Sequence, residues 1–360
     1  MANRDILAIG TSAGGFEALR FLAKELPGDL PAAILVVIHL PSQFRSDLDA
    51  ILTQAGPLAA SFAQEGEVFQ RRHIYIAPPE RHLLVDGDRL QLGKGPRENN
   101  ARPAIDPLFR SAALCCGPRA VGVVLTGTLG DGASGLQALK HSGGITVVQD
   151  PTDAAYAEMP ATALSRSKPD HVVGLVGMPA LLERLVLQPA GKEMPVPEAV
   201  KYEVEVARSG HSSMRNMDRI GRRSVLACPD CHGVMWEIDE GDLIRYRCHV
   251  GHAYTAELMS LALDENLRRA LASALRALDE RTALAQKLYR DAHDSGRERA
   301  AQSWVTKAQE FEEQASVIRD SMMRLDEIDT RSTLEFEHQR KAQEPDRRSS
   351  PGPQKARAGH

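Results

Sequence analysis

Residues 9–19 read IGTSAGGFEAL, and this stretch decides how the first half of the chain folds. It joins an apolar run, ILAIG, to a segment with helical spacing, GFEALRFLAKEL. Glycines and a serine between a strand and a helix are typical of a tight turn. Ser12 stands in that turn, where it could be a nucleophile, part of a phosphate-binding loop, or a turn residue that caps the helix.

Apolar runs and helical patterns continue to alternate as far as about Leu187. The runs AAILVVIHL, AVGVVLTG and ITVVQD read as buried strands, and ASGLQALKHSG reads as a helix. This alternation predicts an α/β fold, a doubly wound and mostly parallel sheet with helices on both faces. The segment HIYIAPPERHLLVDGDRLQLG predicts a hairpin insertion, with Asp86-Gly87 as its turn.

The rest of the chain is organised differently. Pro, Gly, Ser and Arg dominate residues 188–224, which we interpret as a linker between a first domain over residues 1–187 and the C-terminal segments. Residues 225–254 form a compact Cys/His module that resembles a zinc ribbon, and residues 255–331 are predicted to form an α-helical hairpin or coiled coil. The polar, Pro-rich residues 332–360 are predicted to be a disordered tail.

The helical prediction depends on a heptad pattern, in which apolar residues recur at alternating spacings of four and three. The pattern comprises Leu267, Leu271, Ala274 and Leu278, and then Trp304, Ala308, Phe311, Ala315, Ile318, Met322 and Leu325. Residues 293–296 offer a break between the two halves. An antiparallel hairpin is the simplest way to cover both apolar stripes, and pairing between two chains is the alternative.

Composition limits the range of functions. The chain has 360 residues, of which 42% are hydrophobic and 26% charged, with a formal net charge of −4. This balance gives no reason to expect nucleic acid as a partner. No apolar run approaches the roughly 20 residues that span a bilayer, and no leader precedes the first strand, so the sequence predicts a cytoplasmic protein without membrane insertion. The five cysteines suit metal ligands and core thiols better than disulfides.

Each role of Ser12 can be weighed against its neighbours. In a dinucleotide fingerprint, Ser12 would replace the middle glycine, and His39 would stand where an acidic residue usually meets the ribose. Residues 10–14 satisfy the hydrolase pattern Gly-x-Ser-x-Gly, although only one strand precedes it here, whereas several precede the nucleophile in the α/β-hydrolase fold. For an isolated motif, the turn role would be favoured.

The residues at two other strand ends favour a catalytic role for Ser12 over the turn role. His39 closes AAILVVIHL, and Asp131 follows AVGVV in the loop LTGTLGDGASG. The carboxyl ends of strands in a doubly wound sheet converge at one edge, so Ser12, His39 and Asp131 could form a catalytic triad. In such a triad, imidazole takes the serine proton and carboxylate orients the imidazole. The amide N–H groups of Ala13 and of the loop around Thr128 are candidates for stabilising an oxyanion.

The Cys/His module has the spacing of a metal site. Cys228 and Cys231 form a CxxC pair, and Cys248 and His252 follow in the segment CHVGH. Three cysteines and one histidine complete a tetrahedral structural zinc site, which would explain how so short a segment folds. His252 is preferred to His249, because a histidine adjacent to Cys248 could hardly bind the same ion. A redox CxxC is disfavoured, because no thioredoxin-like βαβ unit surrounds it.

Six blocks follow one another along the chain, namely IGTSAGG, VVIHLP, IYIAPPERHL, RPAIDPLFRSAA, VVLTGTLGDGASG and DPTDAAYAEMPATA. In this order they resemble the catalytic domain of the chemotaxis protein-glutamate methylesterases. The resemblance covers about residues 5–187. It implies that Ser12, His39 and Asp131 are catalytic, that no cofactor takes part in catalysis, and that the enzyme hydrolyses glutamate methyl esters on methyl-accepting chemoreceptors. The family often also deamidates receptor glutamines.

The chain departs from the family pattern in two places. The family's usual N-terminal receiver domain has no room here, because the first strand begins at about Asp5. Thr128-Leu129-Gly130 replaces a more usual Met-Gly-Asn before the aspartate, which affects the expected oxyanion pocket.

A receptor, a receptor methyltransferase or a kinase are the expected partners, and the C-terminal module is expected to dock to one of them. The alternative is a non-catalytic signalling adaptor that retains the fold and binds partners through this module.

Overall fold

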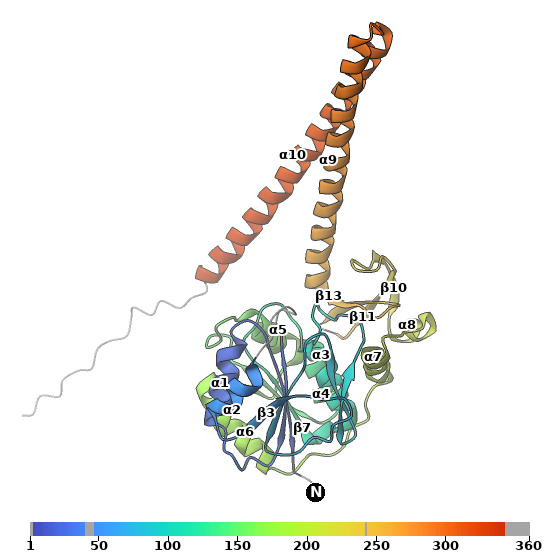
Figure 1. The fold of residues 1–360 in the computed structure, drawn as a ribbon. Helices are drawn as coiled ribbons and strands as arrows, with labels where there is room; N and C mark the ends of the chain where they lie inside the picture. The colour runs from blue at the N-terminus through green and yellow to red at the C-terminus, as the bar shows by residue number, and fades with distance from the viewer. Residues whose placement is uncertain (1–2, 40–46, 242, 343–360) are drawn as a thin grey trace, which may run out of the picture. The chain divides into compact units, whose positions relative to one another are not determined.

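The computed structural model describes residues 3–39, 47–241 and 243–342, with side chains as far as residue 325. The chain divides into two compact units, residues 1–262 and residues 263–360 (Figure 1). Among the residues described, no helix combines the length and the apolar character needed to cross a bilayer.

The first unit is built on a parallel sheet of seven strands in the order β3-β4-β2-β1-β7-β8-β9. The strands are β1 (Ile6–Thr11), β2 (Ala33–Ile38), β3 (Ala59–Phe62), β4 (His73–Ile76), β7 (Ala120–Val124), β8 (Ile145–Gln149) and β9 (His171–Val173). The strand order reverses at β1, which pairs with β2 on one side and with β7 on the other. Sheets of this kind bind ligands beyond the carboxyl ends of the strands at such a switch point.

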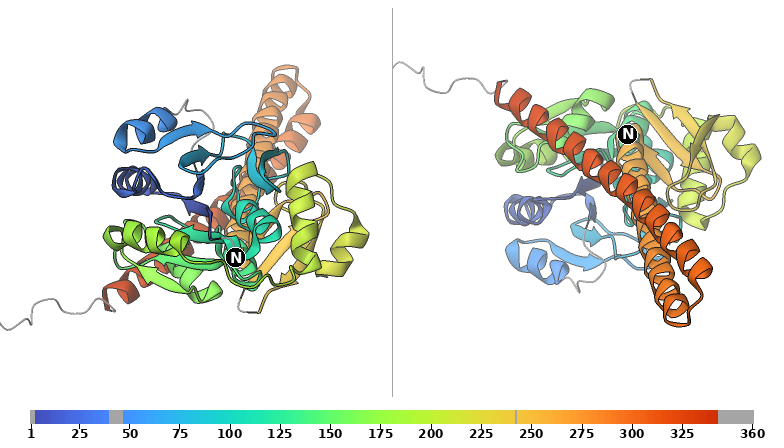
Figure 2. Two further views of the ribbon diagram at one scale, coloured as in Figure 1. Left: turned by 90° about the horizontal axis from the view of Figure 1, so that it is seen from below. Right: turned by 90° about the horizontal axis from the view of Figure 1, so that it is seen from above.

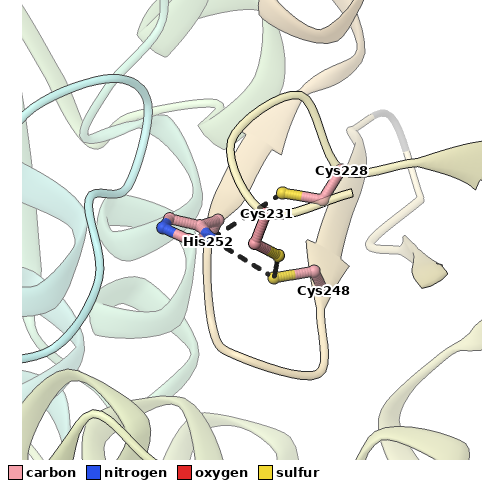
Figure 3. A group of neighbouring side chains, drawn as sticks. All are labelled: Cys228, Cys231, Cys248 and His252. Carbon is pink, nitrogen blue, oxygen red and sulfur yellow. Dashed lines mark hydrogen bonds between the residues drawn. The ribbon is translucent and has the colours of Figure 1, made fainter. Parts of the chain in front are cut away.

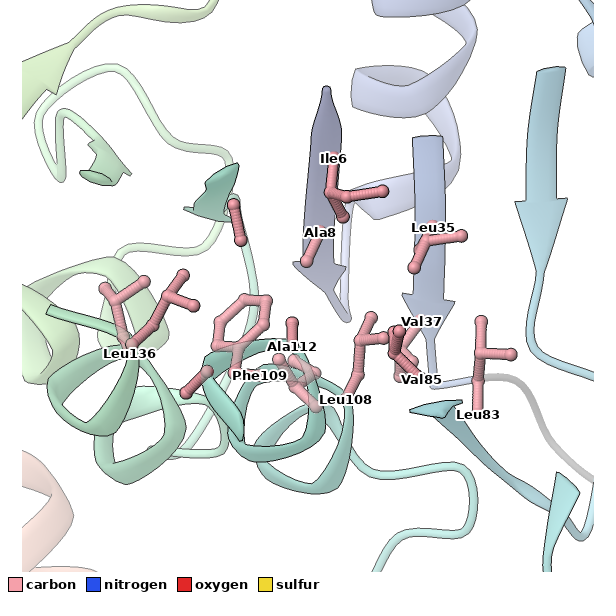
Figure 4. Packing of buried hydrophobic residues seen from close by; sticks show 14 of the residues in the cluster. Ile6, Ala8, Leu35, Val37, Leu83, Val85, Leu108, Phe109, Ala112 and Leu136 are labelled. Carbon is pink, nitrogen blue, oxygen red and sulfur yellow. The ribbon is translucent and has the colours of Figure 1, made fainter. Parts of the chain in front are cut away.

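Helices cover both faces of this sheet, as the sequence predicts (Figure 2). They are α1 (Gly15–Glu25), α2 (Leu48–Ala55), α3 (Ile105–Cys115), α4 (Ala133–His141), α5 (Glu158–Ser167) and α6 (Met178–Leu187), with short 3₁₀ helices at Gly117–Arg119 and Leu175–Gly177. Because side chains of a strand alternate between faces, Ile6 and Ala8 pack with α3, α4 and α5 (Figure 4). Leu7 and Ile9 pack with α1, α2 and α6.

The predicted hairpin insertion is confirmed. Strands β5 (His82–Asp86) and β6 (Arg89–Gly93) pair in antiparallel fashion outside the main sheet. Gly87 in the turn has φ 64°, a left-handed conformation that glycine adopts without strain. Leu83 and Val85 point into the core that contains α3, so the hairpin fixes this helix beneath the sheet.

Residues 188–224, predicted from sequence to be a linker, contain α7 (Glu198–Ser209) and α8 (Met214–Ile220). Val200 and Val204, one helical turn apart, are buried in the core beside α3. This short apolar stripe is flanked by Pro, Gly and Ser, whose abundance conceals it. The Ser213 hydroxyl caps α8 by accepting a hydrogen bond from the Asn216 N–H (3.2 Å).

The Cys/His module is a four-stranded antiparallel sheet in sequence order. Its strands are β10 (Arg222–Ala227), β11 (Val234–Asp239), β12 (Ile244–Cys248) and β13 (Ala253–Thr255). The sheet begins slightly before the predicted start at residue 225. It belongs to the same compact unit as the parallel sheet.

The second unit contains most of α9 (Ala256–Asp294) and all of α10 (Glu298–Ala342), which confirms the helical hairpin. Small buried residues mark the contact between the helices, namely Ala285, Ala292, Ala301, Ala308 and Ala315. Two predicted seam positions are wrong, because Leu267 and Ala274 are exposed. The tail predicted from residue 332 also begins too early, since α10 continues to Ala342, and residues 343–360 lie outside the described part.

Candidate active site and metal centre

The structure brings Ser12, His39 and Asp131 together at the switch point of the sheet. Ser12 follows β1, His39 follows β2, and Asp131 lies between β7 and α4. His39 Nδ1 is 3.2 Å from Ser12 Oγ, and His39 Nε2 is 2.9 Å from Asp131 Oδ2. With its Nε2 proton donated to Asp131, the imidazole has a free lone pair on Nδ1 that can accept the serine proton.

The Asp131 carboxylate is buried but well supplied with hydrogen-bond donors. Its side chain is 2% exposed and accepts the backbone N–H groups of Ile105 (2.6 Å) and Asp106 (3.2 Å). These two residues begin α3, and the N-terminus of a helix favours negative charge. Burial raises the pKa of Asp131, but the hydrogen bonds from His39, Ile105 and Asn99 outweigh burial and hold it below the usual range.

Asn99 joins the Asp131 carboxylate to a second buried carboxylate. Its side-chain amide donates to Asp131 Oδ1 (2.9 Å) and to Asp106 Oδ2 (3.0 Å). Burial, together with the negative charge of Asp131, raises the pKa of Asp106 to about 7, although Arg110 opposes this shift. Sequence reasoning missed Asn99, because a pair of asparagines in a polar loop is typical of any surface turn.

The candidate oxyanion donors lie beside the nucleophile. The Thr126 hydroxyl donates to the Ala13 carbonyl (3.0 Å) and holds the turn after β1. A Cβ on Gly127 would come within 2.9 Å of Ser12 Cβ, so the loop before Asp131 runs directly against Ser12. Within the described residues, the N–H groups of Ala13 and Thr128 have no hydrogen-bond partner, and both remain candidates.

A cleft of about 420 Å³ opens over the triad. Thr128 and Leu129 line it together with the triad itself. Two arginines also line it and share one carboxylate, since Arg102 lies 2.8 Å and Arg97 lies 3.4 Å from Glu80. Substrate that reaches Ser12 therefore passes a polar, partly cationic rim.

The four predicted metal ligands gather between the strands of the Cys/His sheet (Figure 3). His252 Nδ1 lies 3.7 Å from Cys228 Sγ and 3.5 Å from Cys248 Sγ, and Cys231 Sγ lies 3.6 Å from Cys248 Sγ. A tetrahedral zinc ion with bonds of about 2.3 Å to sulfur and about 2.0 Å to nitrogen would separate its ligands by roughly 3.5–3.8 Å. These four side chains could hold a metal ion.

His249 is not part of this group. Its ring stands over Gly233, where an added Cβ would come within 2.4 Å of it. The geometry therefore agrees with the choice of His252 made from sequence spacing. The absence of a side chain on Gly233 leaves space for the ring beside the ligand cluster.

A Ser-His-Asp relay at the switch point of a doubly wound sheet is an arrangement typical of serine hydrolases. The family model described as CheB methylesterase matches residues 7–182. A Leptospira interrogans protein, provisionally named protein-glutamate methylesterase/protein-glutamine glutaminase, is 35% identical over 184 residues, which are 51% of this chain and 95% of that protein. The chain belongs to the CheB methylesterase family.

Other relatives are longer. The Methanosarcina mazei protein-glutamate methylesterase/protein-glutamine glutaminase 2 is 36% identical over 191 residues, and the chain spans only about half (52%) of its length. The crystal structure of the Thermotoga maritima CheB methylesterase catalytic domain is 30% identical, with a TM-score of 0.49, and covers 52% of this chain and 100% of that chain. The family match ends at residue 182, before α7, the Cys/His sheet and the helical hairpin.

Proposed function

We propose that this protein is a serine esterase that hydrolyses glutamate methyl esters on methyl-accepting chemoreceptors. The observation that carries the proposal is the position of His39, which lies within hydrogen-bond distance of both Ser12 and Asp131. Membership of the CheB methylesterase family supports the substrate class.

In the proposed reaction, Ser12 Oγ attacks the ester carbonyl while His39 Nδ1 takes its proton. Asp131 keeps the proton on Nε2 and stabilises the imidazolium that forms. The N–H groups of Ala13 and Thr128 are the proposed donors to the oxyanion. His39 then protonates the departing methanol, and a water molecule activated by the same imidazole releases the glutamate.

Deamidation of receptor glutamines is a second reaction of the same site. It would follow the same acyl-enzyme route, with ammonia instead of methanol as the leaving group. The names of the relatives, which include protein-glutamine glutaminase, support this extension. In this proposal both reactions use protein side chains and backbone N–H groups, without a cofactor.

We further propose that the Cys/His cluster holds a structural zinc ion. Four protein ligands complete a tetrahedral site and leave no open position for substrate, as in other structural zinc sites. Free thiols at Cys228, Cys231 and Cys248 suit a reducing compartment, so we place the reaction in the cytoplasm. A receptor methyltransferase or kinase would be a functional partner, and the C-terminal module would dock to a receptor or to one of these enzymes.

Methanol release from a methylated receptor fragment tests the enzymatic proposal. Ser12→Ala is expected to lose at least about a thousandfold of the rate, because the acyl acceptor is removed. Ser303→Ala, on an exposed face of α10, is the matched control and should retain the wild-type rate.

Two results would contradict this proposal. Equal release by wild type and Ser12→Ala would overturn the triad assignment. Receptor binding without any methanol release would favour the alternative of a non-catalytic signalling adaptor.

A further inference from the structure

Residues 98–99, which contact the proposed catalytic carboxylate of Asp131, are bound to the Cys/His sheet. Asn99, whose side chain bridges Asp131 and Asp106, is almost fully buried and has φ 52°. Its backbone N–H donates to the carbonyl of Ala253 (2.8 Å), the first residue of β13. The amide that orients Asp131 is therefore anchored to a strand far away in sequence.

The residue before Asn99 makes the second connection. Glu98 is buried, and its carboxylate lies 2.8 Å from Arg110 on α3 and 2.8 Å from Arg247 on β12. Arg247 also donates to the Gly251 carbonyl (2.9 Å), so it links Glu98 to the loop between β12 and β13. A buried ion pair of this kind is costly to break, because removing either partner leaves an uncompensated buried charge.

Both anchors adjoin candidate metal ligands. Arg247 immediately precedes Cys248, and Ala253 immediately follows His252. The segment 248–252 thus carries two of the four ligands, and the two anchors flank it. An ion bound to the cluster would fix the loop and, with it, the positions of both anchors.

We propose that the Cys/His module is a clamp that positions the catalytic aspartate through Asn99. A metal ion on the cluster holds Arg247 and Ala253, these hold residues 98–99, and the Asn99 amide then holds Asp131 in line with His39. This inference rests on the proposed function, because it assigns a role in the same reaction. Asn99 is a positioning residue here, since its amide contacts the catalytic carboxylate and not the reacting atoms.

A bound ion would order the segment that carries its ligands, as metal binding does in small structural zinc sites. Loss of the ion would leave three thiols and an imidazole without a common centre. The loop between β12 and β13 would loosen, and the contacts to Glu98 and Asn99 would weaken with it. The esterase would then respond to zinc although zinc never touches the substrate.

The test compares wild type with Asn99→Gly, each with bound Zn²⁺, after removal of zinc by a chelator, and after its return. Glycine tolerates the left-handed backbone of position 99, so this variant removes only the amide. The readouts are the rate at which a fluorophosphonate labels Ser12, the zinc content and the unfolding temperature. The labelling rate reports on the triad whatever the natural substrate is.

Zinc removal is expected to slow labelling of wild type about tenfold or more, as expected for losing hydrogen bonds to a charged group, and zinc should restore the rate. Zinc-loaded Asn99→Gly should be labelled about tenfold more slowly than wild type. Removal of zinc should slow its labelling by less than about twofold more, because this variant already lacks the link to the module. The unfolding temperature should fall in both proteins. Arg72→Gly, which changes another left-handed residue away from the cleft, should behave like wild type.

The possible outcomes distinguish failure of the clamp proposal from failure of the proposed esterase function. If zinc-loaded wild type is not labelled, the proposed function and the clamp both fail. If labelling is indifferent to zinc, or if zinc removal slows both proteins equally, the clamp alone is overturned.

If the zinc-free protein unfolds, labelling of zinc-loaded Arg247→Lys is measured in place of the zinc-removal experiment. Lysine cannot contact Glu98, Glu203 and the Gly251 carbonyl together, so labelling should slow while the zinc content stays at one ion per chain. Arg222→Lys, at an exposed position of β10, is its control and should be labelled at the wild-type rate. Unchanged labelling of Arg247→Lys would overturn the clamp.

Discussion

Gly127 shows how closely two loops approach each other at the nucleophile. A Cβ at this position would meet Ser12 Cβ at 2.9 Å and the flexible end of Met159 at 2.6 Å. The methionine can move aside, but the Ser12 backbone is held by a hydrogen bond from its N–H to the Thr126 carbonyl (3.1 Å). A side chain at 127 would therefore displace the serine from His39.

Gly127→Ala is expected to lower kcat for ester hydrolysis by about 10- to 100-fold, since a displacement of the order of 1 Å at a reacting group has this effect. Gly191→Ala is the matched control, because an added Cβ there meets nothing closer than 3.8 Å. Steady-state kinetics of both variants check the prediction. Equal kcat values in the two variants would show that the loop does not constrain Ser12.

At the scale of residues, the meeting of Ser12, His39 and Asp131 could be predicted, and the contacts that hold Asp131 could not. Ser12, His39 and Asp131 follow three apolar runs, and strand ends in a parallel sheet meet at one edge. Asn99 lies in no such pattern, because its role depends on a left-handed backbone and on contacts with β13 and α3. Contacts of that kind are set by tertiary packing, which a local pattern does not encode.

The elements with long, regular periodicity are those that the sequence predicts well. The helical hairpin follows from a sustained heptad pattern, yet Leu275 on α9 is half-buried whereas Ala274 is exposed. Both residues are apolar, so the pattern alone cannot choose between them. Helix α7 is not predicted, because its apolar stripe is only about three turns long and so gives a weak periodic pattern.

The packing of α9 against α10 depends on small side chains. Arg281 lies over the ring of Phe311, with 4.2 Å from its guanidinium carbon to the ring centroid, and Ala308 is buried beside them. Ala308→Glu would insert a large charged side chain into this contact. It is expected to lower the free energy of unfolding of the hairpin by about 1–3 kcal/mol, a typical effect of overpacking.

Urea unfolding followed by tryptophan fluorescence measures this change. The chain has two tryptophans, so a Trp236→Phe background leaves Trp304 on α10 as the only reporter. Gln309→Glu adds the same charge at the next, exposed position and should leave the transition unchanged. Identical transitions for the two variants would contradict an antiparallel contact through Ala308.

At the scale of the whole first unit, buried charges join segments that the sequence separates. Glu203 on α7 accepts hydrogen bonds from Arg245 (2.9 Å) and Arg247 (3.1 Å) on β12, and it lies 3.4 Å from Arg110 on α3. Burial raises the pKa of Glu203, but these three guanidinium groups outweigh burial and hold it far below the usual range. The supposed linker thus supplies the anion that binds the Cys/His sheet to the α/β core.

Glu203→Gln is therefore expected to lower the free energy of unfolding of this unit by about 3–5 kcal/mol, because Arg110, Arg245 and Arg247 stay buried with less compensating charge. Glu205→Gln, on the exposed side of the same helix, should change it by less than about 1 kcal/mol. Since the folded pKa of Glu203 is depressed, its contribution is present at neutral pH and is lost as the pH falls below about 4, where unfolded glutamate takes up a proton. Urea unfolding at pH 7 and at about pH 3 should show the difference between wild type and Glu203→Gln narrowing at the lower pH. A difference that widens there, or that equals the effect of Glu205→Gln, would mean that other contacts join the two sheets.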